Sequence, residues 1–139
     1  MPAKVFLDTN VAVYAYDRDA PEKQKRAQEI LEEGLREGNG VVSAQVLGEF
    51  FNVVTRRIKT PMSADEAQEI VSTLGLLSVV ELDLALVQRA IDTHKQYQVA
   101  YWDALIIASA ERAGCDRILS EDLSDGQRYH GIAVSNPFA

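Results

Sequence analysis

Four carboxylates that lie far apart in the sequence could together hold a metal ion: Asp8, Glu49, Asp103 and Asp122. Oxygen ligands without histidine or cysteine favour Mg²⁺ or Mn²⁺ over zinc. A metal held by several acids suits phosphoryl transfer, because it neutralises the phosphate, lowers the pKa of a bound water and stabilises the leaving oxygen. This chemistry needs no nucleophilic side chain, and none is apparent. The four acids can form such a site only if the fold brings them to one place.

Short apolar runs alternate with longer amphipathic stretches along the sequence. The apolar runs predict strands at 5–7, 40–43, 78–82, 117–120 and 132–134. The amphipathic stretches predict helices at 22–38, 43–58, 63–77, 83–96 and 101–113. The predicted order, β-α-α-β-α-α-β-α-α-β-β, is typical of one α/β domain over 1–139 whose mostly parallel sheet carries helices on both faces.

The predicted strands place the four acids at one edge of that sheet. In an open parallel sheet, ligands bind in the crevice beyond the carboxyl ends of the strands. Asp8 directly follows the first strand, and Glu49 lies in the second turn of the helix that follows the second strand. Asp103 lies at the start of the helix before the fourth strand, and Asp122 comes just after that strand. We therefore expect a common site for all four.

Helix periodicity separates two of these acids from ordinary surface residues. Glu49 lies at the border of the apolar face of its helix, and Asp103 lies in a helix that is apolar nearly all the way round. An ionised carboxylate left unpaired in such surroundings costs on the order of several kcal/mol. Since no Lys or Arg lies within a helical turn of Asp103, a hard cation is its simplest partner.

Each acid also has an ordinary structural interpretation. Asp8 and Asp103 could cap helices, Glu49 could be a border residue of an amphipathic helix, and Asp122 could belong to a turn. Single acids near a helix start are more often caps than catalysts. The set favours a site, because caps need not come from four different elements at one sheet edge. The histidines, His94 and His130, are interpreted as solvent-side polar residues.

Other phosphate-handling sites lack their motifs here. The Gly38-Asn39-Gly40 segment has Ser43 where a dinucleotide fingerprint needs its third glycine, and no P-loop Gly-Lys-Ser/Thr occurs. A phosphatase of the haloacid dehalogenase type would need a general acid at position 10, where Asn10 cannot supply the proton. A nuclease that relies on metal alone needs neither motif.

Composition indicates a soluble globular protein with an unexpected charge. The 139 residues include 14 Lys and Arg against 21 Asp and Glu, a net charge of −7 that at first argues against a polyanionic partner. The lone Cys115 agrees with a reducing cytoplasm. No signal-peptide core is present, and no apolar run approaches the ~20 residues that cross a bilayer. We therefore expect a cytoplasmic protein without a membrane segment.

Four sequence motifs together resemble those of the PIN domain, and in particular the small ribonucleases of VapBC-type toxin–antitoxin pairs. The motifs are VFLDTN at 5–10, S-x5-EF at 43–50, WDALI at 102–106 and LSED at 119–122. The resemblance covers essentially the whole chain. It implies a three-layer α/β/α sandwich and an endoribonuclease that hydrolyses RNA by a metal-activated water, with Mg²⁺ or Mn²⁺.

The resemblance also assigns roles to residues. The conserved acids of the family match Asp8, Glu49, Asp103 and Asp122, which would bind metal and carry catalysis. Thr9 and Asn10 would orient Asp8, and Ser120 supplies the hydroxyl of the family's Ser/Thr-x-Asp motif. Asp125 is either an additional ligand or a turn former, and whether Glu121 also binds metal stays open.

The resemblance further implies partners: an RNA substrate, a cognate antitoxin that inserts a basic side chain into the acidic pocket, and a second copy in a homodimer. Arg56 and Arg57, which follow Glu49 on its helix, are the candidates for RNA phosphate contacts. The alternative is a non-catalytic PIN-like module that binds RNA or protein. Such a module would be expected to lose acids, and this chain keeps all four.

Overall fold

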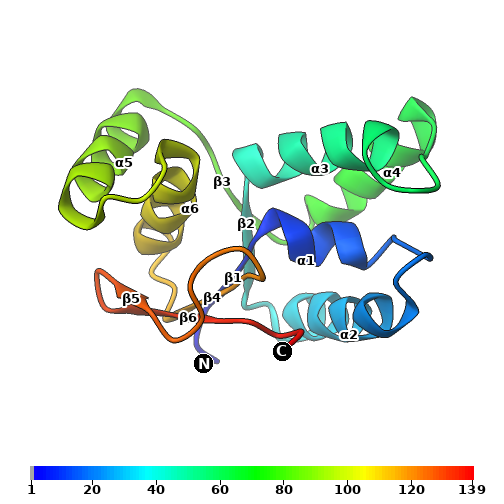
Figure 1. Ribbon diagram of the computed structural model, residues 1–139, viewed down its shortest axis with the longest axis horizontal. Coiled ribbons are helices and arrows are strands. Elements are labelled where there is room, and N and C mark those ends of the chain that lie inside the picture. The colour runs from blue at the N-terminus through cyan, green and yellow to red at the C-terminus, as the bar shows by residue number, and fades with distance from the viewer. Residues whose placement is uncertain (1) are drawn as a thin grey trace.

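One six-stranded sheet runs through the computed structural model, which describes residues 2–139 (Figure 1). The strand order is β3-β2-β1-β4-β6-β5, and all neighbouring pairs are parallel except β5 with β6. The strands are β1 (Val5–Leu7), β2 (Gly40–Ser43), β3 (Ser78–Val80), β4 (Arg117–Leu119), β5 (Arg128–Tyr129) and β6 (Ile132–Ser135). The first strand therefore lies inside the sheet, between β2 and β4.

Helices cover both faces of the sheet (Figure 1). The chain moves in one direction from β1 through β2 to β3 and then returns past β1 to β4. Because parallel crossovers are right-handed, α1 to α4 cover one face and α5 and α6 the other. The helices are α1 (Thr9–Tyr14), α2 (Pro21–Glu37), α3 (Ala44–Arg56), α4 (Ala64–Leu74), α5 (Leu84–Tyr97) and α6 (Tyr101–Arg112). The predicted sandwich with a mostly parallel sheet is confirmed.

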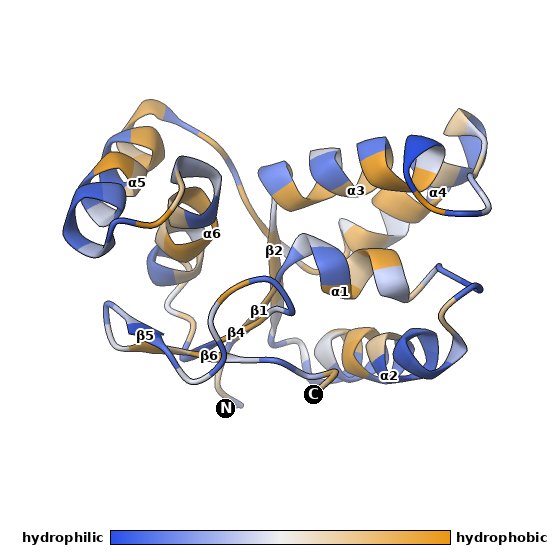
Figure 2. Cartoon of the chain, viewed as in Figure 1, coloured by the Kyte–Doolittle hydropathy of each residue, from blue (hydrophilic) through white to orange (hydrophobic). Residues whose placement is uncertain are grey.

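The pattern of apolar residues explains this arrangement. All of β2 is buried, and so are Phe6 and Leu7 of β1, as expected for strands that are covered on both faces. In Figure 2 the central strands are hydrophobic, whereas hydrophobic and hydrophilic stretches alternate along the helices. In α6 every residue from Ala104 to Ala110 is buried, which makes it the innermost helix of its layer. No helix within residues 2–139 is long and apolar enough to span a membrane.

Side-chain caps start three of the predicted helices. Ser43 Oγ accepts a hydrogen bond from Val46 N at the start of α3, and Asp83 does the same for Leu86 N in α5. At the start of α4, Ser63 accepts from Glu66 N and its hydroxyl donates to the Glu66 carboxylate. These caps fix where the chain turns from strand or loop into helix.

The structure differs from the predictions mainly at element ends. The helix expected to reach position 77 ends at Leu74, and the strand expected to reach position 82 ends at Val80. The predicted order included two helices between the first two strands, but periodicity located only the second, because α1 has just six residues. The turn-rich stretch contains an unpredicted strand, β5, which pairs with β6 through a turn at Gly131 with φ +80°.

The interpretation of His130 as a solvent-side residue is wrong. Its side chain is 8% exposed, and its ring nitrogens lie 2.9 Å from Thr93 Oγ1 and 3.2 Å from an Arg89 nitrogen. Tyr97 Oη accepts from the His130 backbone N–H. The β5–β6 hairpin is thus fastened to α5 by polar contacts that sequence periodicity does not report.

Gly40→Ala should lower the free energy of unfolding by about 1–3 kcal/mol. A Cβ at position 40 would lie 2.8 Å from Leu77 Cδ2 and 3.1 Å from Gly34 Cα, where α2 crosses β2. The matched control is Gly48→Ala in α3, because nothing lies within 4 Å of its added Cβ. This control should be neutral or stabilising by up to about 1 kcal/mol in urea unfolding. Equal effects of the two variants would contradict the close packing at Gly40.

Candidate metal and phosphodiester site

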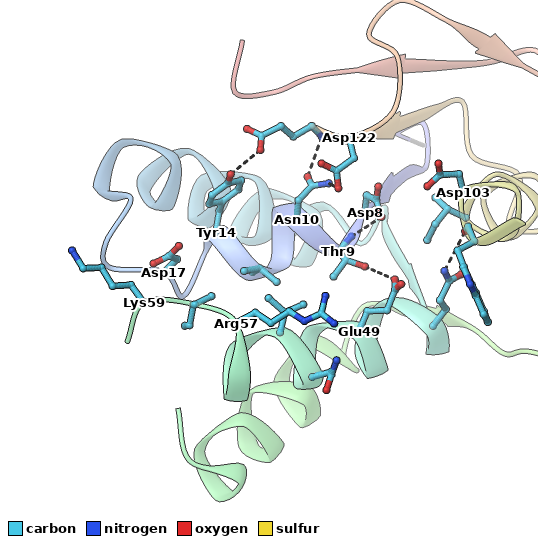
Figure 3. A pocket seen from close by; sticks show the side chains of 18 residues that line it. Asp8, Thr9, Asn10, Tyr14, Asp17, Glu49, Arg57, Lys59, Asp103 and Asp122 are labelled. Atoms are coloured by element: carbon cyan, nitrogen blue, oxygen red, sulfur yellow. Dashed lines mark hydrogen bonds between the residues drawn. The ribbon is translucent and has the colours of Figure 1, made fainter. Parts of the chain in front are cut away.

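A pocket of about 660 Å³ lies where β1, β2 and β4 end (Figure 3). All four predicted acids line it: Asp8, Glu49, Asp103 and Asp122. They come from the end of β1, from α3, from α6 and from the loop after β4. The fold therefore brings together the set that the strand ends predicted.

Asp8 is the most buried of the four acids, with 7% of its surface exposed. Its Oδ1 accepts from Thr9 N at 2.7 Å and thereby caps α1, while its Oδ2 accepts from Ser120 Oγ at 2.7 Å. Burial raises the pKa of Asp8 to about 6 against the lowering effect of these two hydrogen bonds, and the negative charges of Asp122 and Glu49 add to the rise. Asp8 is thus a helix cap and a pocket acid at once.

Thr9 connects two of the acids. Its backbone N–H donates to Asp8, and its hydroxyl donates to Glu49 Oε1 at 2.9 Å (Figure 3). Glu49 reaches the pocket because α3 starts at the end of β2, one and a half turns before it. The predicted role of Thr9 beside Asp8 thus corresponds to a contact in the structure.

Asp103 lies in the first turn of α6 and faces the pocket rather than packed protein. Burial raises its pKa above the ordinary value, and the negative charge of Asp122 raises it further. The helix cap is Ala100, so the interpretation of Asp103 as a cap does not hold. The preceding residue, Trp102, is 61% exposed, although the sequence pattern placed it among the apolar positions of a buried helix.

Asn10 and Ser120 position the loop that carries Asp122. Ser120 Oγ accepts from the backbone N–H groups of Asp122 and Leu123 while its hydroxyl donates to Asp8. Asn10 Nδ2 donates to Asp122 Oδ2 at 3.3 Å, and Asn10 Oδ1 accepts from Glu121 N at 3.1 Å. Asn10 therefore contacts the loop, and it is linked to Asp8 through Ser120 Oγ, to which its Nδ2 also donates at 3.4 Å.

The two acids whose role the sequence left open, Glu121 and Asp125, have other partners. Glu121 is held by Lys23 Nζ at 2.6 Å and by the Tyr14 hydroxyl at 2.7 Å. Burial acts to raise the pKa of Glu121, but these two hydrogen bonds outweigh it and lower the pKa. Asp125 lies outside the pocket and accepts from Asn136 N, which is the contact of a turn former. Sequence reasoning missed Tyr14 and Lys23 as partners of this loop, because no local pattern links α2 to position 121.

The basic residues divide between the pocket and the open surface. Arg57 lines the pocket together with Lys59, whereas Arg56 is exposed outside it. Figure 3 shows Arg57 and Lys59 on the side of Asp8 and Glu49 opposite to Asp103. Of the two predicted RNA contacts, only Arg57 shares the pocket with the acids.

The donor set fits a hard divalent cation. Among residues 2–139, no ion pair involves Asp8, Glu49, Asp103 or Asp122, and the charge of one pocket acid raises the pKa of another. In the same part of the chain, no three His, Cys, Asp or Glu side chains form a group placed to hold a metal ion. The site is therefore a set of mutually repelling oxygen donors, and Arg57 and Lys59 line the pocket without forming an ion pair with any of the four acids.

Comparison with known protein families finds a match over most of the chain. The family model of the PIN domain matches residues 5–124. No curated protein sequence matches the chain.

Several solved structures are similar over most of the chain. A toxin–antitoxin complex from Klebsiella pneumoniae is 15% identical, with a TM-score of 0.69 over 96% of this chain and 98% of that one. DNA-bound VapBC from Salmonella typhimurium is 17% identical, with a TM-score of 0.69 over 98% and 99%. VapC20 of Mycobacterium tuberculosis, a Sarcin-Ricin loop cleaving toxin, is 20% identical, with a TM-score of 0.62 over 86% and 90%. At these identities the likeness shows the fold.

The raised pKa of Asp8 predicts a pH-dependent stability in the presence of a chelator. Its folded pKa of about 6 exceeds the ordinary 3.8, so the folded state binds the proton more tightly than the unfolded state. The contribution of Asp8 to the free energy of unfolding should be most favourable below pH 4. It should fall by roughly 3 kcal/mol as the pH rises from about 4 to 6 and stay constant above pH 6.

Urea unfolding of wild type and Asp8→Asn across this pH range measures the effect. The difference between the free energies of unfolding of wild type and Asp8→Asn should change between pH 4 and 6 and stay constant above pH 6. Glu69→Gln, an exposed acid on α4, is the control and should follow wild type. Parallel profiles for wild type and Asp8→Asn would show that Asp8 titrates normally.

Proposed function

Because the chain belongs to the PIN-domain family, we propose that it is an endoribonuclease that hydrolyses RNA phosphodiester bonds with Mg²⁺ or Mn²⁺. The observation that carries this proposal is the convergence of four acids from four elements on one pocket. Within residues 2–139, the most buried of them, Asp8, forms no ion pair. Oxygen-only donors of this kind match hard divalent ions and the phosphoryl chemistry they support.

The chain's own residues have distinct roles in this proposal. Asp8 and Asp103 hold the main ion, and Glu49 and Asp122 complete the set directly or through water. Ser120 and Thr9 fix the Asp8 carboxylate by the two hydrogen bonds they donate, so that its orientation does not depend on the ion. When bound, the ion supplies charge neutralisation at the scissile phosphate and a lowered pKa for the attacking water.

The proposal extends to the biological setting. The similar structures include a toxin–antitoxin complex and DNA-bound VapBC, at 15% and 17% identity. We infer that this chain is the cytoplasmic toxin of such a pair, that it forms a homodimer, and that its antitoxin places a basic side chain among the pocket acids. The unpaired acids support the last point, because a Lys or Arg would relieve the same repulsion that a metal relieves.

Removal of a metal ligand tests the catalytic proposal. Asp103→Asn should lower the rate of RNA cleavage by at least about 100-fold and leave RNA binding within a few-fold of wild type. Wild-type cleavage should require Mg²⁺ or Mn²⁺, stop with EDTA and return when the ion is restored. The control is Glu69→Gln, which should cleave like wild type. RNA binding without cleavage under every divalent ion tested would instead identify a non-catalytic module.

The two neighbouring arginines separate pocket contacts from surface charge. Arg57→Ala should weaken RNA binding and reduce the slope of log affinity against log salt by about 1, because one phosphate contact is lost. Arg56→Ala removes the same charge from the neighbouring position outside the pocket and should leave the slope unchanged. Equal slopes for the two variants would show that the RNA strand does not pass Arg57.

A further inference from the structure

Trp102 is an exposed tryptophan in the wall of the acid pocket. It is the only tryptophan of the chain, and 61% of its surface is exposed although the seven residues Ala104 to Ala110 of the same helix are buried. It lines the same pocket as Asp103, its neighbour in sequence. The exposed apolar surface of this ring is unfavourable in water, and packing within the fold does not bury it.

Neighbouring side chains hold Trp102 at this place. Tyr101 packs against its ring in an edge-to-face arrangement with centroids 5.0 Å apart. Gln45, near the start of α3, donates from Nε2 to the Trp102 backbone oxygen at 3.2 Å and so ties α6 to α3 across the pocket. The ring is exposed, but its backbone and one neighbour restrict where it can lie.

Gln45 also shows a feature found nowhere else in the described chain. Among the buried side-chain oxygens and nitrogens of residues 2–139, only Gln45 Oε1 has no hydrogen-bond partner. Buried polar groups without a partner are rare, and those that occur often mark a functional site or the place of a bound water or ion. Here the orphaned oxygen lies in a residue that lines the pocket and contacts Trp102.

We propose that Trp102 is the stacking platform for an unpaired RNA base next to the scissile phosphate. This inference rests on the proposed function for the identity of the strand. Proteins grip single-stranded RNA by stacking splayed bases on aromatic rings, whereas paired bases do not offer their faces. The site therefore selects single-stranded or looped RNA over duplex.

The rest of the pocket gives the strand a path. Asp103, beside Trp102, lies on one side of Asp8 and Glu49, and Arg57 and Lys59 lie on the other (Figure 3). A strand that stacks one base at Trp102 and crosses the acids brings a following phosphate to the basic side. The base platform, the acids and the basic residues thus correspond to three successive parts of one RNA strand.

Fluorescence of the single tryptophan tests the inference without relying on cleavage. A short single-stranded oligoribonucleotide, mixed with the protein and Mg²⁺ by stopped flow, should quench Trp102 before cleavage proceeds. Strands with abasic sites throughout, or the same strand annealed to its complement, should quench much less. Trp102→Ala should raise KM for the single strand by roughly tenfold or more with kcat nearly unchanged, and Trp102→Tyr should restore most of the loss.

Matched controls make the outcomes distinct. Leu82→Ala removes another exposed apolar side chain, 51% exposed and outside the pocket, and should behave like wild type. Equal quenching by intact and abasic strands, or an unchanged KM for Trp102→Ala, would overturn the inference, as would a Trp102→Ala variant that loses only antitoxin binding. Base-dependent quenching without any cleavage would support the inference and refute the proposed nuclease.

Discussion

The buried carboxylate at the end of the central strand is the constraint on which the site depends. Asp8 follows β1, which lies between β2 and β4, so its side chain is surrounded by protein with 7% of its surface exposed. Burial raises its pKa to about 6, which means that ionised Asp8 destabilises the fold at neutral pH. Hydrogen bonds from Thr9 and Ser120 offset part of this cost. The other acids are arranged around a charge that the fold itself does not neutralise.

The same hydrogen bonds make the site and the fold interdependent. Ser120 donates to Asp8 and accepts from two backbone N–H groups of its own loop, so the fourth acid is positioned by the residue that steadies the first. Lys23 and Tyr14 hold that loop from outside through Glu121, and Tyr14 in turn packs edge-on against Phe138 at 5.0 Å. A change in the packing of α1 or α2 would therefore shift the position of Asp122 through this loop, without any direct contact with Asp122.

The sequence was sufficient for the order of the elements from β1 to β4 and for the convergence of the four acids. The acids converge because they follow strand ends at one edge of a parallel sheet. It did not locate α1 or β5, which are too short for periodicity. It did not show that Asn10 donates a hydrogen bond to Asp122, 112 residues away, and it wrongly left His130 in solvent. It also did not predict that Trp102 is exposed, because helical periodicity indicates which face of a helix is apolar but not which of its turns is covered by other elements.

The net charge of −7 also takes on a different meaning once the acids are located. Without the four predicted site acids, the excess of acidic over basic residues falls from seven to three. Under the proposed function, two divalent ions would cancel the charge of these four carboxylates, and Arg57 and Lys59 would contact the strand beside them. A basic side chain from an inhibitor would compensate part of the same negative charge. Under the same proposal, metal-assisted RNA binding and inhibition by a basic residue would compete for one set of carboxylates, and the acidity of this protein would serve its regulation as well as its chemistry.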